Sequence, residues 1–204
     1  IHSAGYVAPL IAGAHSVVTI PDLNFLVHPD DFGFAGRWTQ RLLVPLSARL
    51  SHGVFTLTES ARAEIVREFG LDDSKVLCTP CGIDPAFESS LRDADIERIR
   101  ARYGLPERYA FCPSASHPHK NLERLLRAYA LLSRERRIDF GLVVTGSRGR
   151  ADRAVRQTAA QLDLENQVRL LGWIDRGDMP ALYAHARCLI FPTLYEGFGL
   201  PLIE

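Results

Sequence analysis

The chain has no long hydrophobic run, and none approaches the about 18 apolar residues that a helix needs to cross a bilayer. It also has no net charge, because Lys and Arg together number 24 and Asp and Glu number 24. This balance excludes a broad electrostatic attraction to nucleic acid, so we expect no nucleic-acid partner. Internal repeats and low-complexity tracts are missing too. What is there is an ordinary globular composition, with 47% hydrophobic residues and room for one or two domains in 204 residues.

Cysteine is scarce, and four cysteines do not form a disulfide framework in a chain of this length. Cys78 and Cys81 have the spacing of a redox or half-zinc motif, but no second pair follows to complete a tetrahedral zinc site. Cys112 and Cys188 each lie in an apolar run, where we expect buried thiols. The cysteines therefore favour a structural role and a cytoplasmic location.

Short β-branched runs alternate with helical patterns along the chain, which predicts an α/β fold with parallel sheets. We expect strands at 16–20, 54–58, 75–78, 109–113, 142–145, 168–171 and 188–191, and helices at 37–50, 59–69, 121–134, 151–162 and 179–186. A turn cluster and a charged stretch interrupt this alternation around 80–102. We place a domain boundary there, giving domains 1–88 and 89–204. Because the chain starts and stops in mid-pattern, we expect both domains to be incomplete.

The predicted helix 37–50 has two interpretations. Leucines 42, 43, 46 and 50 share one face, which favours a helix packed on a core. The same helix carries Trp38 and several arginines, which suits a helix resting on a membrane surface. The core helix is the favoured interpretation, and peripheral contact with the inner face of a membrane is the alternative.

The last nine residues contain two carboxylates, Glu196 and Glu204, around a Gly-Phe-Gly turn and Pro201. Proline suits the first turn of a helix, where backbone N–H groups and the positive end of the dipole attract anions. The amides of Phe198, Gly199 and Leu200 can then face a phosphate, while the carboxylates accept hydrogen bonds from hydroxyl groups. A nucleotide sugar has both kinds of group. An acidic, capped helix start is the purely structural alternative.

Three further residues follow predicted strand ends, where open α/β sheets bind ligands. Lys120 lies between a strand and a helix and is a compact cation suited to a diphosphate. Gly146 opens a glycine turn, and a turn of this kind can approach a nucleotide. It lacks the dinucleotide-binding and P-loop patterns, so a turn without a binding role is the alternative. His2 is interpreted as following the end of a strand that precedes the given sequence, although a lone histidine is usually structural.

With these motifs the chain resembles the family-4 retaining glycosyltransferases, which have the two-domain GT-B architecture. The resemblance extends over essentially all 204 residues, and the terminal motif is its most specific part. The other segments that carry it are Thr-Ile-Pro-Asp-Leu (19–23), Thr-Glu-Ser-Ala-Arg (58–62), Pro-Cys-Gly-Ile-Asp-Pro (80–85), His-Lys-Asn-Leu (119–122) and Val-Arg-Leu-Leu-Gly-Trp (168–173).

The resemblance implies two Rossmann-like domains facing a cleft, and transfer of a sugar from a UDP- or GDP-linked donor to a glycan or lipid-linked glycan. It implies no bound metal and no cofactor. The implied catalytic residues are Glu196 and His2. The implied donor-binding residues are Lys120 for the diphosphate, Glu204 for the ribose, and Phe198, Gly199 and Leu200 for the sugar and phosphate, with Gly146 beside them and the segment near Gly172 close to the base.

Two positions depart from the family's usual pattern. Ser114 stands where an arginine is frequent, which leaves the diphosphate to Lys120 or His119. Pro21 stands where a histidine is frequent, which weakens the assignment of His2. Two other functions stay open: a GT-B-type nucleotide-sugar epimerase, and a nucleotide-binding fragment without catalysis. We expect the 204-residue piece itself to be inactive.

Overall fold

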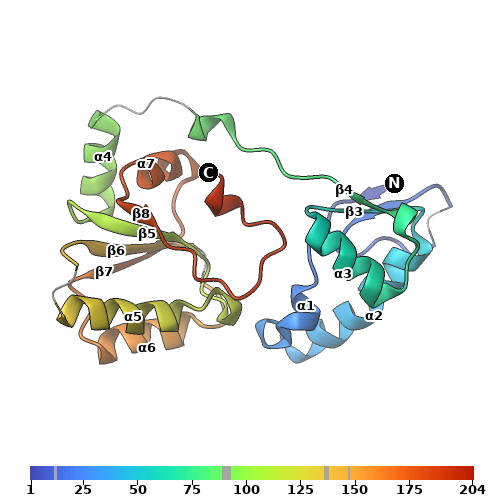
Figure 1. The fold of residues 1–204 in the computed structure, drawn as a ribbon, viewed down its shortest axis with the longest axis horizontal. Coiled ribbons are helices and arrows are strands. Elements are labelled where there is room, and N and C mark those ends of the chain that lie inside the picture. The colour runs from blue at the N-terminus through green and yellow to red at the C-terminus, as the bar shows by residue number, and fades with distance from the viewer. Residues whose placement is uncertain (12, 89–92, 136–137, 147) are drawn as a thin grey trace. The chain divides into compact units, whose positions relative to one another are not determined.

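The computed structural model describes residues 1–11, 13–88, 93–135, 138–146 and 148–204. The start of the predicted second domain (89–92) and Ser147 of the glycine turn lie outside these residues. The chain forms two compact units (Figure 1). The first comprises residues 1–82 and 195–199, and the second comprises residues 83–194 and 200–204. Our division into domains 1–88 and 89–204 stays a prediction beside these units.

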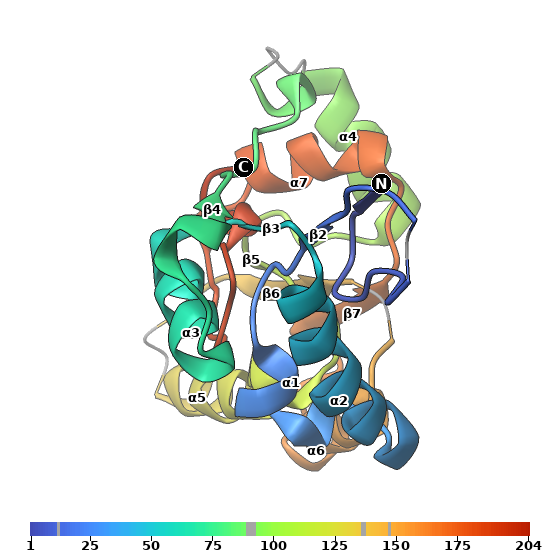
Figure 2. The same ribbon diagram turned by 90° about the vertical axis from the view of Figure 1, so that its right-hand side faces the viewer.

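The first unit is built on a parallel sheet of β1 (His2–Ser3), β2 (Val17–Thr19), β3 (Gly53–Thr56) and β4 (Val76–Cys78), in that order. The helices α1 (Asn24–Val27), α2 (Phe34–Leu50) and α3 (Glu59–Phe69) lie on one side of it (Figure 2). Their core contains Val18 and Val54 of the sheet, Val44 of α2 and Phe69 of α3. Parallel strands joined by helices confirm the α/β prediction for this unit.

Helix α3 has the bounds that the sequence predicts because both of its ends are capped. The Thr58 hydroxyl accepts a hydrogen bond from the Ala61 amide at 3.1 Å, which satisfies one of the unpaired donors at the helix start. Gly70 ends the helix with φ +61°, in the left-handed conformation that glycine adopts without strain.

Helix α2 buries a different face from the one predicted. Its buried residues are Val44, Ser47 and Ala48, whereas Leu42 and Leu50 are exposed. The prediction that the leucine face packs on the core is therefore wrong. Smaller side chains of α2 pack in the core instead. Ser47 is accommodated there because its hydroxyl accepts a 3.1 Å hydrogen bond from the Ala8 amide.

The second unit has a parallel sheet in the order β7-β6-β5-β8, formed by β5 (Tyr109–Pro113), β6 (Gly141–Thr145), β7 (Val168–Gly172) and β8 (Cys188–Leu189). Helices α5 (Leu122–Arg134) and α6 (Asp152–Gln161) cover one face, and α4 (Asp93–Tyr103) and α7 (Met179–Ala184) cover the other (Figure 1). Strand residues alternate between the two faces: Cys112 packs towards α5, and Phe111 towards α7. Both faces are buried, which explains the continuously apolar strands.

Three details of this unit differ from the sequence predictions. Helix α4 forms in the charged stretch 93–102, for which the sequence pattern predicts no element. It buries Ile96 and Ile99, which are at helical spacing. Strand β8 ends at Leu189 rather than at 191. Cys188 is exposed, not buried, because in the described part of the chain β8 is an end strand that pairs only with β5. Within the described residues, no helix has the length and apolarity required to cross a bilayer.

Candidate functional site

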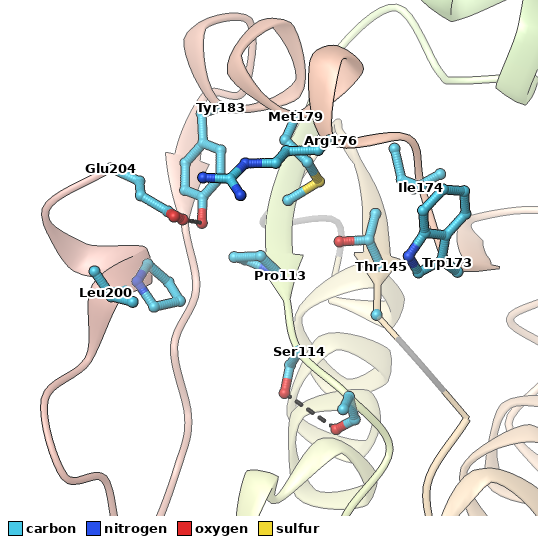
Figure 3. A pocket seen from close by; sticks show the side chains of 13 residues that line it. Pro113, Ser114, Thr145, Trp173, Ile174, Arg176, Met179, Tyr183, Leu200 and Glu204 are labelled. Carbon is cyan, nitrogen blue, oxygen red and sulfur yellow. Dashed lines mark hydrogen bonds between the residues drawn. The ribbon is translucent and has the colours of Figure 1, made fainter. Parts of the chain in front are cut away.

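A cavity of about 350 Å³ opens at the carboxyl ends of the strands of the second unit (Figure 3). We call it the strand-end cavity. Its wall is formed by the ends of β5 and β6 and the residues after three strands, by helix α7 and by the terminal turn: Pro113, Ser114, Ala115, Thr145, Gly146, Trp173, Ile174, Arg176, Met179, Tyr183, Leu200, Pro201 and Glu204. Open α/β sheets bind ligands at this edge. Gly146, Leu200 and Glu204, three of the predicted site residues, therefore lie in one cavity.

Gly146 has a steric reason to be glycine. Its φ is +127°, and a Cβ built on it would lie 2.5 Å from the carbonyl carbon and oxygen of Ser114 and 2.6 Å from the Ala115 amide nitrogen. The Ser114 amide in turn donates to the Thr145 carbonyl at 2.7 Å. The backbones that leave β5 and β6 therefore touch, and they form the floor of the cavity without a side chain between them.

Glu204 is held by a tyrosine that the sequence analysis did not identify. The Tyr183 hydroxyl donates a 2.6 Å hydrogen bond to Glu204 Oε2, and both residues line the cavity (Figure 3). Burial, followed by this carboxylate, raises the pKa of Tyr183 well above its ordinary value, so the hydroxyl stays a donor. The tyrosine ring packs edge-on against Phe111 and Phe87. Glu204 consequently presents a positioned carboxylate to the cavity.

The rim of the cavity carries an exposed indole and an ion pair. Trp173 follows Gly172 at the end of β7 and is 72% exposed, although it lines the cavity. Arg176 donates from Nη2 and Nε to Asp84 Oδ2, at 2.6 and 3.0 Å. The pKa of the Asp84 carboxyl is lowered by the Ala86 amide and by Arg176. A large exposed aromatic at a cavity rim suits stacking on a flat ring.

Lys120 closes a 3-10 turn, Pro118–Lys120, between β5 and α5, as the sequence predicts, but it lies outside the lining of the cavity. Its ammonium is 5.9 Å from the centre of the Phe191 ring. It also acts on Cys112 at the end of β5: burial raises the pKa of that thiol to about 12, and the Lys120 charge opposes the rise. Lys120 thus lies on the same sheet edge as the cavity.

The residues beside Lys120 hold the segment that leads to the terminal motif. The His119 carbonyl accepts a 2.8 Å hydrogen bond from the Leu194 amide, and Asn121 Nδ2 donates to the Pro192 carbonyl at 3.1 Å. Asn121 adopts φ +59°, a conformation that asparagine tolerates better than most residues. These bonds join the Lys120 turn to the chain just before Tyr195.

His2, Glu196, Phe198 and Gly199 belong to the first unit. His2 is the first residue of the two-residue strand β1, so the prediction that it follows the end of a strand is wrong. Its Nε2 is 2.8 Å from the Thr19 hydroxyl at the end of β2. The Tyr195 hydroxyl donates to Glu64 Oε2 at 2.7 Å and accepts from the Leu23 amide at 3.0 Å. These residues are described within the first unit alone, and their roles stay predictions.

Gly197 lies close to the chain at Pro21 and Asp22. A Cβ on Gly197 would lie 2.7 Å from the Pro21 carbonyl oxygen and from Asp22 Cβ. The contact therefore uses the backbone of Pro21 and not its side chain. The Thr58 hydroxyl, which caps α3, also donates to the Gly197 carbonyl at 2.9 Å.

Metal ligands do not gather at the site: across the described residues, no three His, Cys, Asp or Glu side chains are grouped as a metal would need.

The sequence pattern does not predict Tyr183, Arg176 and Met179 as residues of the cavity wall. Tyr183 has no signal of its own, because a buried aromatic on a short helix is typical of a core. Trp173 does have a sequence signal, because it follows a glycine at a predicted strand end.

The family described as "Glycosyl transferases group 1" matches residues 95–204, which is most of the second unit. The chain belongs to this family. Among curated proteins it is similar to the O-antigen chain mannosyltransferase B of Escherichia coli, with 34% identity over 154 residues. That match covers 74% of this chain and 40% of the relative. The chain therefore spans less than half the length of this relative.

Two solved structures support the fold assignment. WaaG, described as a glycosyltransferase involved in lipopolysaccharide biosynthesis, matches 99% of this chain and 55% of its own, with a TM-score of 0.73 and 19% identity. Anabaena HepE, solved with UDP and glucose, matches 94% of this chain and 50% of its own, with a TM-score of 0.72 and 19% identity. The predicted GT-B fold, with parallel sheets in two units, is confirmed.

Proposed function

We propose that the protein transfers a sugar, with retained anomeric configuration, from a UDP- or GDP-linked donor to a glycan-type acceptor, without a bound metal. The strand-end cavity is the observation that carries this function. It combines the Glu204 carboxylate, the exposed Trp173 indole and the side-chain-free turn at Gly146 on the sheet edge that carries Lys120. Family membership and the UDP bound to HepE support the donor class.

The ribose, the base and the diphosphate of the donor each have a partner in the second unit. Glu204 accepts hydrogen bonds from the ribose hydroxyls, and Tyr183 holds the carboxylate in place for them. Trp173 and the segment at Gly172 contact the base. Lys120 supplies the cation for the diphosphate, because Ser114 offers no positive charge there.

Transfer requires stabilisation of two charges, negative on the departing diphosphate and positive on the sugar ring. Lys120 and the amides of Phe198, Gly199 and Leu200 serve the first charge. Glu196 serves the second, and His2 faces the reacting sugar. The roles of the Phe198 and Gly199 amides, of Glu196 and of His2 rest on the motif pattern.

The test is a screen of nucleotide sugars with the whole protein, measured by release of nucleoside diphosphate and by NMR of the anomeric proton of the product. Lys120→Ala and Glu204→Gln should each lower kcat/KM at least about 100-fold, the effect of losing one charged contact of about 3 kcal/mol. Lys75→Ala, at the only other lysine, and Glu165→Gln, at an exposed glutamate, are the matched controls. Epimerised donor without transfer, or inverted product, would contradict the proposal.

A further inference from the structure

Helix α2 of the first unit carries three large apolar side chains that face solvent. Phe34, Trp38 and Leu42 are 80%, 60% and 69% exposed. They follow one another at four-residue spacing, so they form one stripe within an arc of about 80° around the helix. We call these three residues the α2 stripe. The residues of α2 that are buried in the core of the first unit are Val44, Ser47 and Ala48.

Isolated exposed leucines are normal on a protein surface, but three adjacent large apolar residues are not. The first two also touch each other, since the Phe34 and Trp38 rings pack edge-on with centroids 6.4 Å apart. A contiguous stripe of this kind marks a surface that another apolar phase covers.

The charged residues of helix α2 itself are all arginines. Between Asp31 and Glu59 the sequence contains no acidic residue. Arg41 lies seven residues after Phe34, and Arg49 lies seven residues after Leu42, so both are on the side of the stripe. Arg41 is exposed. Arg49 is exposed too, but its guanidinium donates to the Phe69 carbonyl at 3.1 and 3.2 Å. Asp30, in the 3-10 turn before the helix, is paired with Arg37 at 2.8 Å.

We propose that the α2 stripe docks the first unit on the surface of an anionic lipid bilayer. An aromatic and aliphatic stripe bordered by arginines is the pattern of helices that lie in a membrane interface, with tryptophan at the level of the headgroups. Arg41 binds the fixed negative charge of the lipids, and no acidic side chain of the helix opposes it. This proposal is independent of the strand-end cavity, which lies in the second unit.

Trp38 is the reporter for the test, in a Trp173→Phe background that leaves it the only tryptophan of the chain. The protein is titrated with vesicles of phosphatidylglycerol and phosphatidylcholine, and with vesicles of phosphatidylcholine alone. Brominated acyl chains should quench Trp38 in the anionic vesicles and much less in the neutral ones. Phe34→Ser with Leu42→Ser should weaken vesicle binding at least about tenfold, and Arg41→Gln about fivefold at low salt.

The matched controls lie on α5 of the second unit, where Leu131→Ser removes an exposed leucine and Arg127→Gln an exposed arginine. Both should bind vesicles as the parent does. The proposal is overturned if anionic vesicles do not quench Trp38, or if the controls lose binding equally. It is also overturned if Trp38 is already shielded from acrylamide in the whole protein without lipid. Self-association that the Phe34 and Leu42 changes abolish would assign the stripe to a second copy instead.

Discussion

The hydroxyl of Tyr183 and the carboxylate of Glu204 are joined by a 2.6 Å hydrogen bond across the wall of the strand-end cavity. This bond connects a short helix, α7, to the last residue of the Gly-Phe-Gly motif. It gives the motif's second carboxylate a fixed direction before any ligand arrives, which reduces the entropy lost on binding.

Tyr183→Phe should weaken nucleoside diphosphate binding about tenfold, because a hydrogen bond to a carboxylate contributes about 1.5 kcal/mol at this half-buried position. Titration calorimetry with UDP and GDP measures the effect. Tyr103→Phe is the matched control, since its hydroxyl donates to Asp178 at 2.8 Å outside the cavity. Equal affinity of parent and Tyr183→Phe would show that the bond does not position Glu204 for the ligand.

Gly146→Ala should lower the free energy of unfolding by about 2–4 kcal/mol, because the new Cβ meets the Ser114 backbone and φ +127° is strained for alanine. Denaturant unfolding measures it. Gly177→Ala is the control, as its Cβ would meet no heavy atom within 4 Å. If the two variants are equally stable, the contact between the two strand ends is not as close as described.

Asp178 should make the stability of the second unit depend on pH. Burial raises the pKa of this carboxyl, but hydrogen bonds from Arg98 and Tyr103 and the nearby arginine charges outweigh burial and lower it overall. A lowered folded pKa means that Asp178 stabilises the fold above its unfolded pKa of about 3.9, and that this stability is lost as pH falls through the folded value.

Asp178→Asn should therefore cost about 2 kcal/mol at pH 7, a reduced figure because both arginines are half exposed, and much less near pH 3. Urea unfolding at the two pH values measures the difference. Asp139→Asn, at the exposed ion pair with Arg108, should change stability by less than about 0.5 kcal/mol. A cost for Asp178→Asn that grows as pH falls would reverse the sign of this linkage.

Much of the second unit could be predicted because its strands are buried on both faces and therefore read as apolar runs, as in Tyr109–Pro113. The α3 bounds followed from Thr58 and Gly70. The buried face of helix α2 was predicted wrongly, because a hydrophobic stripe in the sequence does not reveal which part of the molecule packs against it. Helix α4 was missed because charges outnumber Ile96 and Ile99 in its sequence.

The site was predictable where backbone chemistry shapes it, as at Gly146 and the turn before Glu204. It was not predictable where two distant side chains meet. Tyr183 is 21 residues from Glu204, and only the packing of α7 against β5 brings the two together. Cys188 shows the same limit, since its exposure depends on the order of the strands.

Cys112 and Cys188 should differ in their reactivity towards alkylating reagents. Burial raises the pKa of Cys112 to about 12, whereas Cys188 is exposed on an end strand. Iodoacetamide at pH 8 should label Cys188 at least about 100-fold faster than Cys112, because the thiolate is the reactive species. Peptide mass mapping measures both rates, with the denatured protein as the reference. Equal rates in the native protein would contradict the core position of Cys112.

The most direct test of nucleotide binding in the strand-end cavity uses Met179, the chain's single methionine, which lines it. Its ¹³C-labelled methyl resonance, assigned with Met179→Leu, is followed during titration with UDP or GDP. We predict a saturable shift with one of the two nucleotides, weakened at least about tenfold by Glu204→Gln and unchanged by Glu165→Gln. A Met179 resonance that stays fixed while the protein turns over a nucleotide sugar would contradict the assignment of the donor to this cavity.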